Sequence, residues 1–363
     1  MISHYLPGGS KIGSGYQAHY MANALCRRGH HVTMFSLCQA GDAALYKTVV
    51  VPTERPRTFR FAWNLRRIDW SRFDVLHAHG DDYWLWGATR PVHVRTMHGS
   101  CFAEAVHIPR IFEKLRMTLL GLSEVMATLV ADRTACVSRN TAVYYPWVKD
   151  VIVNGVDLSA FYPGHTLRIS GQANSASAAP DGKELQPTIL FVGTYHHRKR
   201  GALLAEAFAR TIRPVLPEAR LWMVCSDAPS ADGVKVFGRI PLEDLAELYR
   251  RAWVFCLPSS YEGFGVPYIE AMASGTPVVA TPNAGAREVL DNGKYGILCQ
   301  PDQLGLTLLR LLRDSSERQR LRTLGLERVK EYSWERVVEQ YEAIYARIAC
   351  DEAGRCRRVV PSH

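Results

Sequence analysis

The stretch "WVFCLPSSYEGFGVPYIEAMASGTPVVAT", residues 253–281, predicts a strand, a loop, a helix and a second strand in direct succession. It opens with an apolar and aromatic run typical of a buried strand, and the serines and glycines that follow are typical of a loop. Pro267 suits the first turn of a helix, because the N–H that proline lacks has no partner there. A helix from about residue 266 to Gly275 therefore separates two strands, which is the repeating unit of a parallel α/β sheet.

Two acidic residues flank the glycine-rich elbow of this stretch. Glu262 lies on the loop, and Glu270 lies about one turn inside the helix, on a face that can still look toward the loop. The glycines let a ligand approach the backbone closely, and the unpaired N–H groups at the helix start suit a phosphate. The pattern indicates a nucleotide sugar, with Glu262 toward the sugar, Glu270 toward the ribose and the phosphate between them. The alternative is a surface loop with an ordinary capping acid.

Short apolar strands alternate with amphipathic helical segments through the rest of the chain. Strands are expected at residues 31–36, 73–79, 92–97, 150–153, 187–193, 219–226, 234–238, 253–258 and 277–281. This alternation predicts parallel sheets covered by helices, and its two series predict two doubly wound, Rossmann-like domains. In such folds ligands bind outside the carboxyl ends of the strands, so we expect the site in a cleft between the two domains.

A segment poor in large apolar residues separates the two series and reads as a linker. The expected organisation is an N-terminal Rossmann-like domain at 1–163, a linker at 164–186, a second domain at 187–332, a helix at 333–348 that returns to the first domain, and a tail at 349–363.

The composition is that of an ordinary globular protein, with 47% hydrophobic and 22% charged residues among 363. The net charge of +9 suits anionic ligands or an anionic membrane face, but it is too diffuse to indicate nucleic acid. The nine cysteines show no CxxC spacing and are expected as free thiols in a reducing compartment. With no signal peptide, and no apolar run long enough to cross a bilayer, we expect a cytoplasmic protein that at most touches the cytoplasmic face of a membrane.

The segment "RPRTFRFAWNLRRIDWSRF", residues 55–73, interleaves six arginines with aromatic residues. One interpretation is a surface that lies against an anionic membrane and delivers the protein to a lipid-linked substrate. The other, which we favour, is a solvated amphipathic helix whose aromatic residues enter the core.

The segment "PSSYEGFGVPYIEAMASGTPVVAT" (258–281) resembles the donor site of retaining GT-B glycosyltransferases of family four, also called group 1. Further likenesses follow in the same order along the chain, over about residues 6–348: "GSGYQAHYMANALCRRGHHVTMFS" (13–36), "FDVLHAHG" (73–80), "RTMHGS" (95–100), "VIVNGVDLSAFYP" (151–163) and "ILFVGTYHHRKRGALLAEAF" (189–208). The resemblance implies the GT-B fold, with an acceptor-side N-terminal domain and a donor-binding second domain. It also implies metal-independent transfer of a hexose, with retention, from a UDP- or GDP-linked sugar to an acceptor hydroxyl, without any cofactor.

The resemblance further implies roles for individual residues. Arg198 and Lys199 match the cations that hold the donor diphosphate, and Arg200 is a third candidate. The chain departs from many members at Thr194, after Gly193, where those members have an arginine. His98 matches a histidine near the reacting sugar. Together with the matches of Glu262 and Lys199 described above, this makes His98, Glu262 and Lys199 the candidate catalytic residues.

Backbone contacts complete the expected site. Residues matched to the diphosphate are Gly13, Ser14, Gly15, Gly265 and Val266, those matched to the sugar are Gly263 and Phe264, and Gly285 and Glu288 border the donor pocket. No Asp-x-Asp pair that could hold a diphosphate-bound metal is present; the adjacent Asp81 and Asp82 are expected to be structural or to lie on the acceptor side.

Three other functions are compatible with parts of the sequence. A catalytically silent sugar-nucleotide-binding protein and a GT-B sugar-nucleotide epimerase share the fold and remain alternatives. "GSGYQA" (13–18) fits a dinucleotide loop only loosely, because no acidic residue follows at the distance that such a loop requires. An NAD-dependent oxidoreductase is therefore disfavoured. The product, whether polysaccharide, glycolipid or small metabolite, is not specified by any residue.

Overall fold

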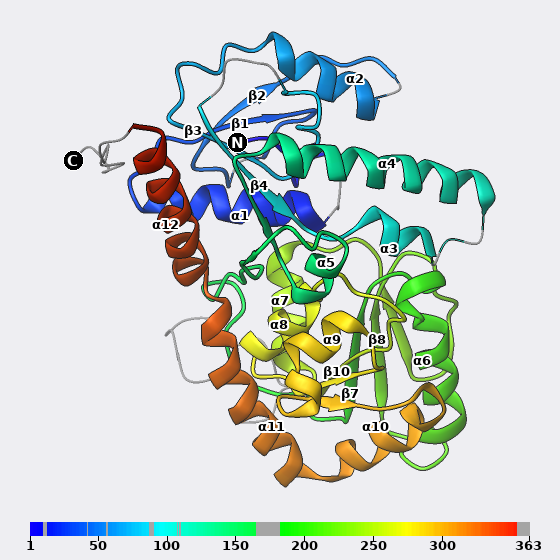
Figure 1. Cartoon of the computed structure of the whole chain (residues 1–363). Helices are drawn as coiled ribbons and strands as arrows, with labels where there is room; N and C mark the ends of the chain where they lie inside the picture. Colours follow the sequence, from blue (N-terminus) through cyan, green and yellow to red (C-terminus); the bar gives the residue numbers. More distant parts are fainter. Residues whose placement is uncertain are drawn as a thin grey trace. The chain divides into compact units, whose positions relative to one another are not determined.

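The structure, a computed structural model, describes residues 1–9, 13–41, 43–55, 57–86, 91–106, 108, 110–164 and 182–353 (Figure 1). Side chains are described within these ranges except at Thr58 and from residue 349 onward. The chain divides into two compact units: unit 1 is Met1–Gly155 with Trp334–His363, and unit 2 is Val156–Ser333. Most of the expected linker, residues 165–181, and the end of the expected tail, residues 354–363, lie outside the described residues.

Unit 1 is built on parallel strands that meet through the first residues of the chain. Its strands are β1 (Thr33–Ser36), β2 (Lys47–Val50), β3 (Val75–Ala78), β4 (Val92–Met97), β5 (Arg133–Cys136) and β6 (Asp150–Val151). β1 pairs with β2, and β3, β4, β5 and β6 pair in that order, all in parallel. Ile2 forms a parallel bridge to both Phe35 of β1 and Ala78 of β3, so it joins the two groups of strands.

Helices cover both faces of this sheet. They are α1 (Gly13–Arg27), α2 (Arg57–Asn64), the 3-10 turn η1 (Leu65–Arg67), α3 (Cys101–Val106), α4 (Ile111–Val130), α5 (Arg139–Val143) and α12 (Trp334–Ala353). Successive strand residues point to opposite faces. On one face Val94 packs with Leu25 of α1 and Val338 of α12, and on the other Met97 packs with Val125 of α4.

Unit 2 is a six-stranded parallel sheet in the order β12-β11-β10-β7-β8-β9. The strands are β7 (Thr188–Val192), β8 (Arg220–Val224), β9 (Val234–Phe237), β10 (Val254–Leu257), β11 (Val278–Ala280) and β12 (Ile297–Leu298). All five strands expected in this half of the chain are confirmed, and the short β12 was not expected. The two parallel sheets confirm the predicted α/β, doubly wound class.

The helices of unit 2 alternate with its strands. They are α6 (Gly201–Ala207) with its π-helical continuation η3 (Phe208–Ile212), α7 (Leu242–Arg251), α8 (Val266–Ala273), α9 (Ala284–Val289), α10 (Leu304–Arg313) and α11 (Ser315–Arg328). Short 3-10 turns are η2 (His197–Lys199), η4 (Asp291–Gly293), η5 (Pro301–Gln303) and η6 (Val329–Tyr332). Among the described residues, no helix combines the length and the hydropathy that a membrane crossing requires.

The strand order decides which loops meet. β7 and β10 are neighbours in the sheet of unit 2, so the loops at their carboxyl ends, residues 193–200 and 258–265, lie beside each other. These loops carry the expected cations and Glu262. In unit 1, His98 follows the carboxyl end of the central strand β4 in the same way.

Candidate functional site

The loop after β7 presents its cations to the loop after β10. The Nζ atom of Lys199 lies 2.7 Å from Oε1 of Glu262, and Nη1 of Arg198 lies 3.1 Å from Oε2 of the same carboxylate. Arg198 also donates a hydrogen bond of 2.7 Å to the carbonyl oxygen of Tyr261, and its own carbonyl accepts one of 2.9 Å from the N–H of Ser260. The structure therefore brings together the three charged residues that the sequence predicted, across 63 residues of chain.

The ion pairs set the charge state of the cluster. The Glu262 side chain is 7% exposed, and burial by itself favours a neutral carboxyl group. Against this burial, the charges of Lys199 and Arg198 hold the pKa of Glu262 below its ordinary value. Burial in turn lowers the pKa of Lys199, although Glu262 opposes the change. With Glu262 ionised and Lys199 and Arg198 both cationic, these three side chains together carry a net charge of +1.

Glycines let the loop after β10 turn into α8 and pack against α9. Gly265 has a φ angle of 103°, which side chains other than glycine rarely adopt, and directly precedes Val266, the first residue of α8. The N–H of Gly285 donates a hydrogen bond of 3.2 Å to the carbonyl of Glu262. A Cβ atom on Gly285 would lie 2.5 Å from the carbonyl oxygen of Phe264, so only glycine fits there without displacement.

Glu270 lies in the second turn of α8 and is half-buried. Its Oε2 atom accepts a hydrogen bond of 3.0 Å from the hydroxyl of Tyr249, a fully buried residue of α7. Burial raises the pKa of Glu270 to about 7, although the hydrogen bond from Tyr249 and the charge of Lys199 act in the opposite direction. Glu270 is therefore a carboxyl group whose protonation changes near neutral pH.

The remaining predicted residues of unit 2 occupy the same loops. Gly193 directly follows β7, and a Cβ atom there would lie 3.1 Å from the Lys199 side chain. The hydroxyl of Thr194 donates to the carbonyl of His196 at 3.1 Å, so it serves the loop itself. Arg200 adopts a left-handed conformation, with φ of 53°, at the start of α6. Gly263 is half-buried in the loop, and Glu288 is half-buried on α9.

His98 in unit 1 belongs to a row of histidines. Its Nε2 atom lies 2.8 Å from Nδ1 of His79, and the two rings stack at 5.1 Å. His79 stacks in turn on His77 at 4.7 Å, and His77 contacts the hydroxyl of Tyr345 on α12 at 2.5 Å. Burial lowers the pKa of His98 to about 4, and burial lowers the pKa values of His77 and His79 well below the ordinary value. All three rings are therefore neutral at pH 7.

The glycine-rich start of α1 is also in unit 1. Gly13 is exposed, with open space where a Cβ would lie, and Ser14 is half-buried. Gly15 is buried, and a side chain there would collide with the carbonyl oxygen of Tyr5. At the helix start, packing therefore requires a glycine at position 15, whereas the backbone at Gly13 is open to a ligand.

Asp81 and Asp82 both have partners inside unit 1. Oδ2 of Asp81 lies 2.9 Å from Nδ1 of His4. The fully buried Asp82 forms an ion pair with Arg95, and its Oδ2 atom lies 3.0 Å from Nε2 of His93. Within the part of the chain that the structure describes, no group of three or more His, Cys, Asp or Glu side chains is arranged to hold a metal ion.

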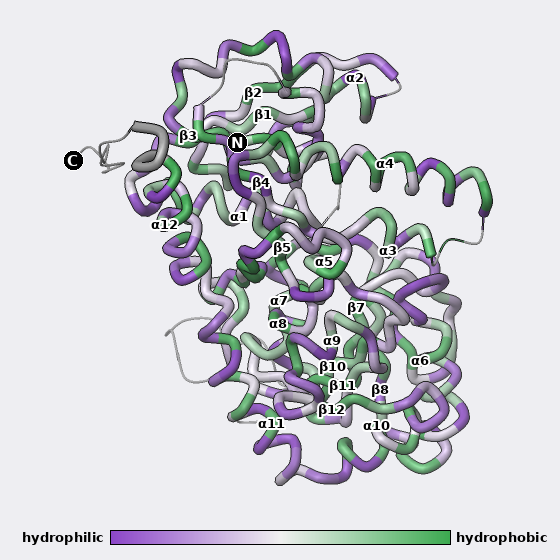
Figure 2. The backbone as a smooth tube through the Cα atoms, in the orientation of Figure 1, coloured by the Kyte–Doolittle hydropathy of each residue, from purple (hydrophilic) through white to green (hydrophobic). Residues whose placement is uncertain are grey.

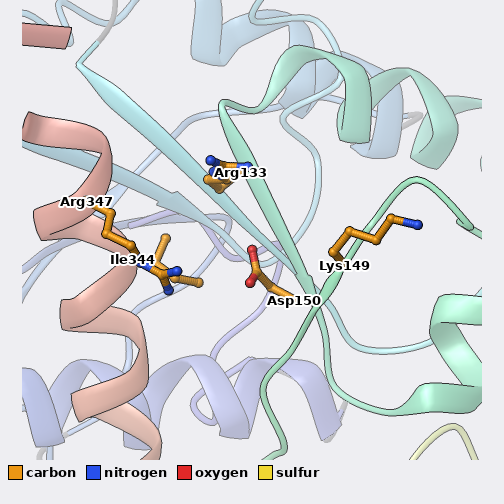
Figure 3. A pocket seen from close by; sticks show the side chains of 5 residues that line it. All are labelled: Arg133, Lys149, Asp150, Ile344 and Arg347. Atoms are coloured by element: carbon orange, nitrogen blue, oxygen red, sulfur yellow. The ribbon is translucent and has the colours of Figure 1, made fainter. Parts of the chain in front are cut away.

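A hollow lies at the opposite edge of the unit 1 sheet. It is lined by Arg133, Lys149, Asp150, Ile344 and Arg347, where β5 and β6 begin and the side of α12 passes (Figure 3). Arg133, Lys149 and Arg347 are exposed, so they form a solvated basic rim rather than a buried binding site. None of the predicted site residues lines it.

Comparison with known proteins places the chain in a family. The family model described as Glycosyltransferase Family 4 matches residues 13–160, and the model described as Glycosyl transferases group 1 matches residues 186–314. The D-inositol 3-phosphate glycosyltransferase of Geodermatophilus obscurus is 30% identical over 329 residues, which cover 80% of this chain and 70% of that protein. The chain belongs to the family 4, or group 1, glycosyltransferases. It is a glycosyltransferase enzyme.

Solved structures support the fold of this glycosyltransferase. The sucrose-phosphate synthase of Thermosynechococcus elongatus matches with a TM-score of 0.75 and 22% identity, over 96% of this chain and 98% of that one. HepE of Anabaena, solved in complex with UDP-glucose, matches with a TM-score of 0.71 and 14% identity, over 94% and 97% of the two chains. The two parallel sheets and these neighbours establish the GT-B fold.

Three residues near the predicted site were not anticipated from the glycosyltransferase sequence. Tyr249 binds Glu270, and His79 binds His98. The Asn283 amide donates to the carbonyl of Ser259 at 3.1 Å and thereby ties the start of α9 to the loop after β10. His79 could have been found because it directly follows the strand in "FDVLHAHG", as His98 follows β4. Tyr249 instead occupies an ordinary apolar position of an amphipathic helix.

Proposed function

We propose that this glycosyltransferase moves a hexose from a nucleotide-diphosphate sugar to an acceptor hydroxyl, with retention of the anomeric configuration and without a metal ion. The observation that carries the proposal is the cluster in which Lys199 and Arg198 share the buried carboxylate of Glu262, on the loop that leads into α8. A cluster with surplus positive charge beside a helix start suits an anion, and a departing diphosphate is such an anion.

In this proposal each group of the cluster has its own task. Lys199 and Arg198 stabilise the negative charge that develops on the leaving diphosphate, and the backbone N–H of Val266 donates to a phosphate oxygen. Glu262 holds both cations in place. A carboxylate has about four lone-pair directions, so Glu262 can also accept a hydrogen bond from a sugar hydroxyl. The fixed cations take the place that a divalent metal would otherwise have.

Glu270 and His98 are proposed to recognise hydroxyl groups. The ionised Glu270 accepts hydrogen bonds from the ribose of the donor while Tyr249 keeps the carboxylate oriented. The neutral imidazole of His98 has one nitrogen that donates and one that accepts, which suits a hydroxyl of the transferred sugar. The exposed Gly13, with Ser14 and Gly15, offers backbone N–H groups to the diphosphate.

The proposed transfer step requires no nucleophile from the enzyme. The bond between the anomeric carbon and the diphosphate oxygen breaks, and the acceptor oxygen forms its bond to the same carbon on the same face. The acceptor proton passes to an oxygen of the departing phosphate, whose charge Lys199 and Arg198 stabilise. The products are the glycosylated acceptor and a nucleoside diphosphate.

The donor is proposed to be UDP- or GDP-linked, and no further cofactor is invoked. HepE, which shares the fold, was solved with UDP-glucose, and this supports a nucleotide sugar as the donor class. The acceptor is a hydroxyl of a polysaccharide, a glycolipid or a metabolite. We also propose that the enzyme is cytoplasmic and touches an anionic membrane surface. It is not expected to bind nucleic acid.

A donor screen tests this function. The purified protein is heated with UDP, GDP, ADP and their hexose conjugates, because a ligand that binds only the folded state raises the melting temperature. We expect a rise with one nucleotide that is lost in Lys199→Ala and Glu270→Ala and kept in Arg210→Ala, which removes an exposed cation of unit 2. No rise with any of these nucleotides would contradict the proposed donor class.

Product analysis then separates the three chemistries that share the fold. Transfer releases a nucleoside diphosphate in the presence of an acceptor and of excess chelator, and the anomeric proton of the product reports retention. An epimerase converts the donor sugar without releasing nucleoside diphosphate, and a silent binder does neither. Either of these two results would overturn the proposed reaction.

A further inference from the structure

Helix α4 exposes a continuous stripe of large apolar side chains. Seven residues are each at least 50% exposed: Ile111, Phe112, Leu115, Leu119, Leu122, Met126 and Leu129. Leaving Phe112 aside, they recur every three or four residues, so they share one face along the whole 20-residue helix. At 1.5 Å per residue this stripe is about 30 Å long. Figure 2 shows hydrophobic and hydrophilic residues alternating along α4.

The opposite face of α4 is fixed to the body of unit 1. Glu124 points inward and accepts hydrogen bonds from the N–H of Cys101 at 2.9 Å and from the hydroxyl of Tyr145 at 2.6 Å. Thr128 accepts a hydrogen bond of 3.0 Å from the indole of Trp147. The helix thus turns Glu124 and Thr128 inward while most of its leucines face outward, which is unusual for a surface helix. These bonds prevent the helix from rotating the stripe into the core.

Gly121 adds a second reason for this orientation. It is buried, and a Cβ atom there would lie 2.7 Å from the ring of Phe102 on α3. A side chain at this point would displace the ring of Phe102. Gly121, Glu124 and Thr128 therefore fix which face of α4 points inward. The apolar stripe is exposed because it lies on the opposite face.

The neighbouring helix α2 also exposes aromatic residues. Ala127 of α4 packs with Ala62 of α2, so the two helices are neighbours (Figure 1). α2 exposes Phe59 and Trp63, and the nearby Trp86 is also half exposed. The guanidinium of Arg66 lies 5.2 Å from the ring centres of both tryptophans. Tryptophan with arginine is a combination that suits the polar boundary of a bilayer.

The charges next to the stripe are predominantly positive. Lys114 and Arg116 are exposed and stand one residue either side of Leu115, which places them about 100° around the helix on the two flanks of the stripe. Of the two acids on α4, Glu113 lies 3.5 Å from Arg110, and Glu124 points inward. Long basic side chains on the flanks can lay their methylene groups along the apolar surface and reach outward with their charges.

We propose that α4 lies in the plane of an anionic lipid membrane, with its apolar stripe inserted among the acyl chains and Lys114 and Arg116 on the headgroups. A second copy of this chain fits the surface less well. Two α4 helices packed together would bring the basic flanks of both copies into one interface, and neither acid of α4 is on the side of the stripe, where it could offset those charges. The inference deepens the membrane contact proposed above by naming its surface, and it is independent of the donor site.

Vesicle sedimentation tests this surface. The full chain is mixed at low salt with phosphatidylcholine vesicles that contain or lack about one third phosphatidylglycerol, since anionic lipid adds roughly 1 kcal/mol of attraction per basic residue. We expect binding at least about tenfold tighter to the anionic vesicles. Leu119→Gln with Leu122→Gln should reduce binding at least about tenfold, as should Lys114→Glu with Arg116→Glu. Leu306→Gln, an exposed leucine on α10 of unit 2, is the matched control.

Other outcomes overturn the proposal. Unchanged vesicle binding in both double variants would exclude α4 as the docking surface, and equal binding to neutral vesicles would exclude the role of its charges. A dimer in sedimentation velocity that the leucine variant dissociates, without vesicle binding, would assign the stripe to a second copy. Nucleotide-induced melting shifts in the same variants separate the two proposals, because they report the donor site and should not change.

Discussion

The Nζ atom of Lys199 lies 2.7 Å from Oε1 of Glu262, whose side chain is only 7% exposed. This contact joins the loops at the carboxyl ends of two neighbouring strands, β7 and β10. It fixes the cation at the start of α8, and it also means that neither residue can be removed without leaving its partner buried with an incomplete charge environment.

Replacement of Lys199 by methionine should therefore harm both stability and donor binding. We expect a loss of unfolding free energy on the order of 3 kcal/mol, because a nearly buried carboxylate loses its closest cation. Adding Glu262→Gln should recover much of the stability but none of the donor affinity, which should stay at least about 100-fold below that of the native enzyme. Chemical denaturation and nucleotide titration measure the two effects. Native-like donor binding in Lys199→Met would refute the role given to this cation.

Gly285 should not tolerate a side chain. Gly285→Ala places a Cβ atom 2.5 Å from the Phe264 carbonyl oxygen, so the loop that carries Glu262 must move. We expect a loss of about 1–3 kcal/mol of stability and weaker donor binding. Gly238→Ala is the matched control, since no atom lies within 4 Å of its added Cβ. Equal melting temperatures for the two variants would show that the close approach of Gly285 has no energetic consequence.

Donor binding should depend on pH through Glu270. Burial raises the pKa of this carboxyl to about 7 in the folded state, above the value of about 4.3 expected in the unfolded chain. The native state thus holds the proton more tightly, so its stability relative to Glu270→Gln should fall as pH rises from about 4.5 to about 7. Ionised Glu270 is the form that accepts ribose hydroxyls, so donor affinity should rise over the same upper range. A flat affinity profile identical to that of Glu270→Gln would contradict this role.

His98 should not produce a titration step in activity near the ordinary histidine pKa. Burial lowers its pKa to about 4, so the imidazole stays neutral at any pH above about 5. Rate measurements over pH in Glu270→Gln, which removes the other titrating group, isolate this effect. A fall in rate below about pH 6.5 in that variant would show that His98 titrates normally.

His79 is predicted to position His98. His79→Phe retains a ring for stacking but removes the 2.8 Å contact to Nε2 of His98. We expect kcat to fall about tenfold or more with little change in the KM of the donor. The reason is that the imidazole of His98 remains in the site but is no longer held in one orientation. His79→Gln, which can still form a hydrogen bond, should restore part of the rate. Nitrogen chemical shifts of His98 should report a changed tautomer mixture in His79→Phe, and unchanged shifts would argue against the positioning role.

The strand and helix pattern was largely predictable, because it depends on neighbours in the sequence. The helix expected from residue 266 begins at Val266, and the strand expected at 92–97 is observed as Val92–Met97. Both segments combine a clear periodicity with strong local signals, such as Pro267 in a first helical turn. The segment 55–73 was harder: Phe61 and Trp70 are buried as favoured, whereas Phe59 and Trp63 are exposed.

The sequence by itself determined the α/β class, the family resemblance and the identity of the charged residues around the glycine-rich elbow. Only the tertiary structure decided that Lys199 and Arg198 share one carboxylate, that Tyr249 holds Glu270, and that α4 turns its leucines outward. The physical reason is the range of the interactions. Periodicity and capping act between residues a few positions apart, whereas strand order, burial and the partners of a buried charge depend on packing across the whole unit.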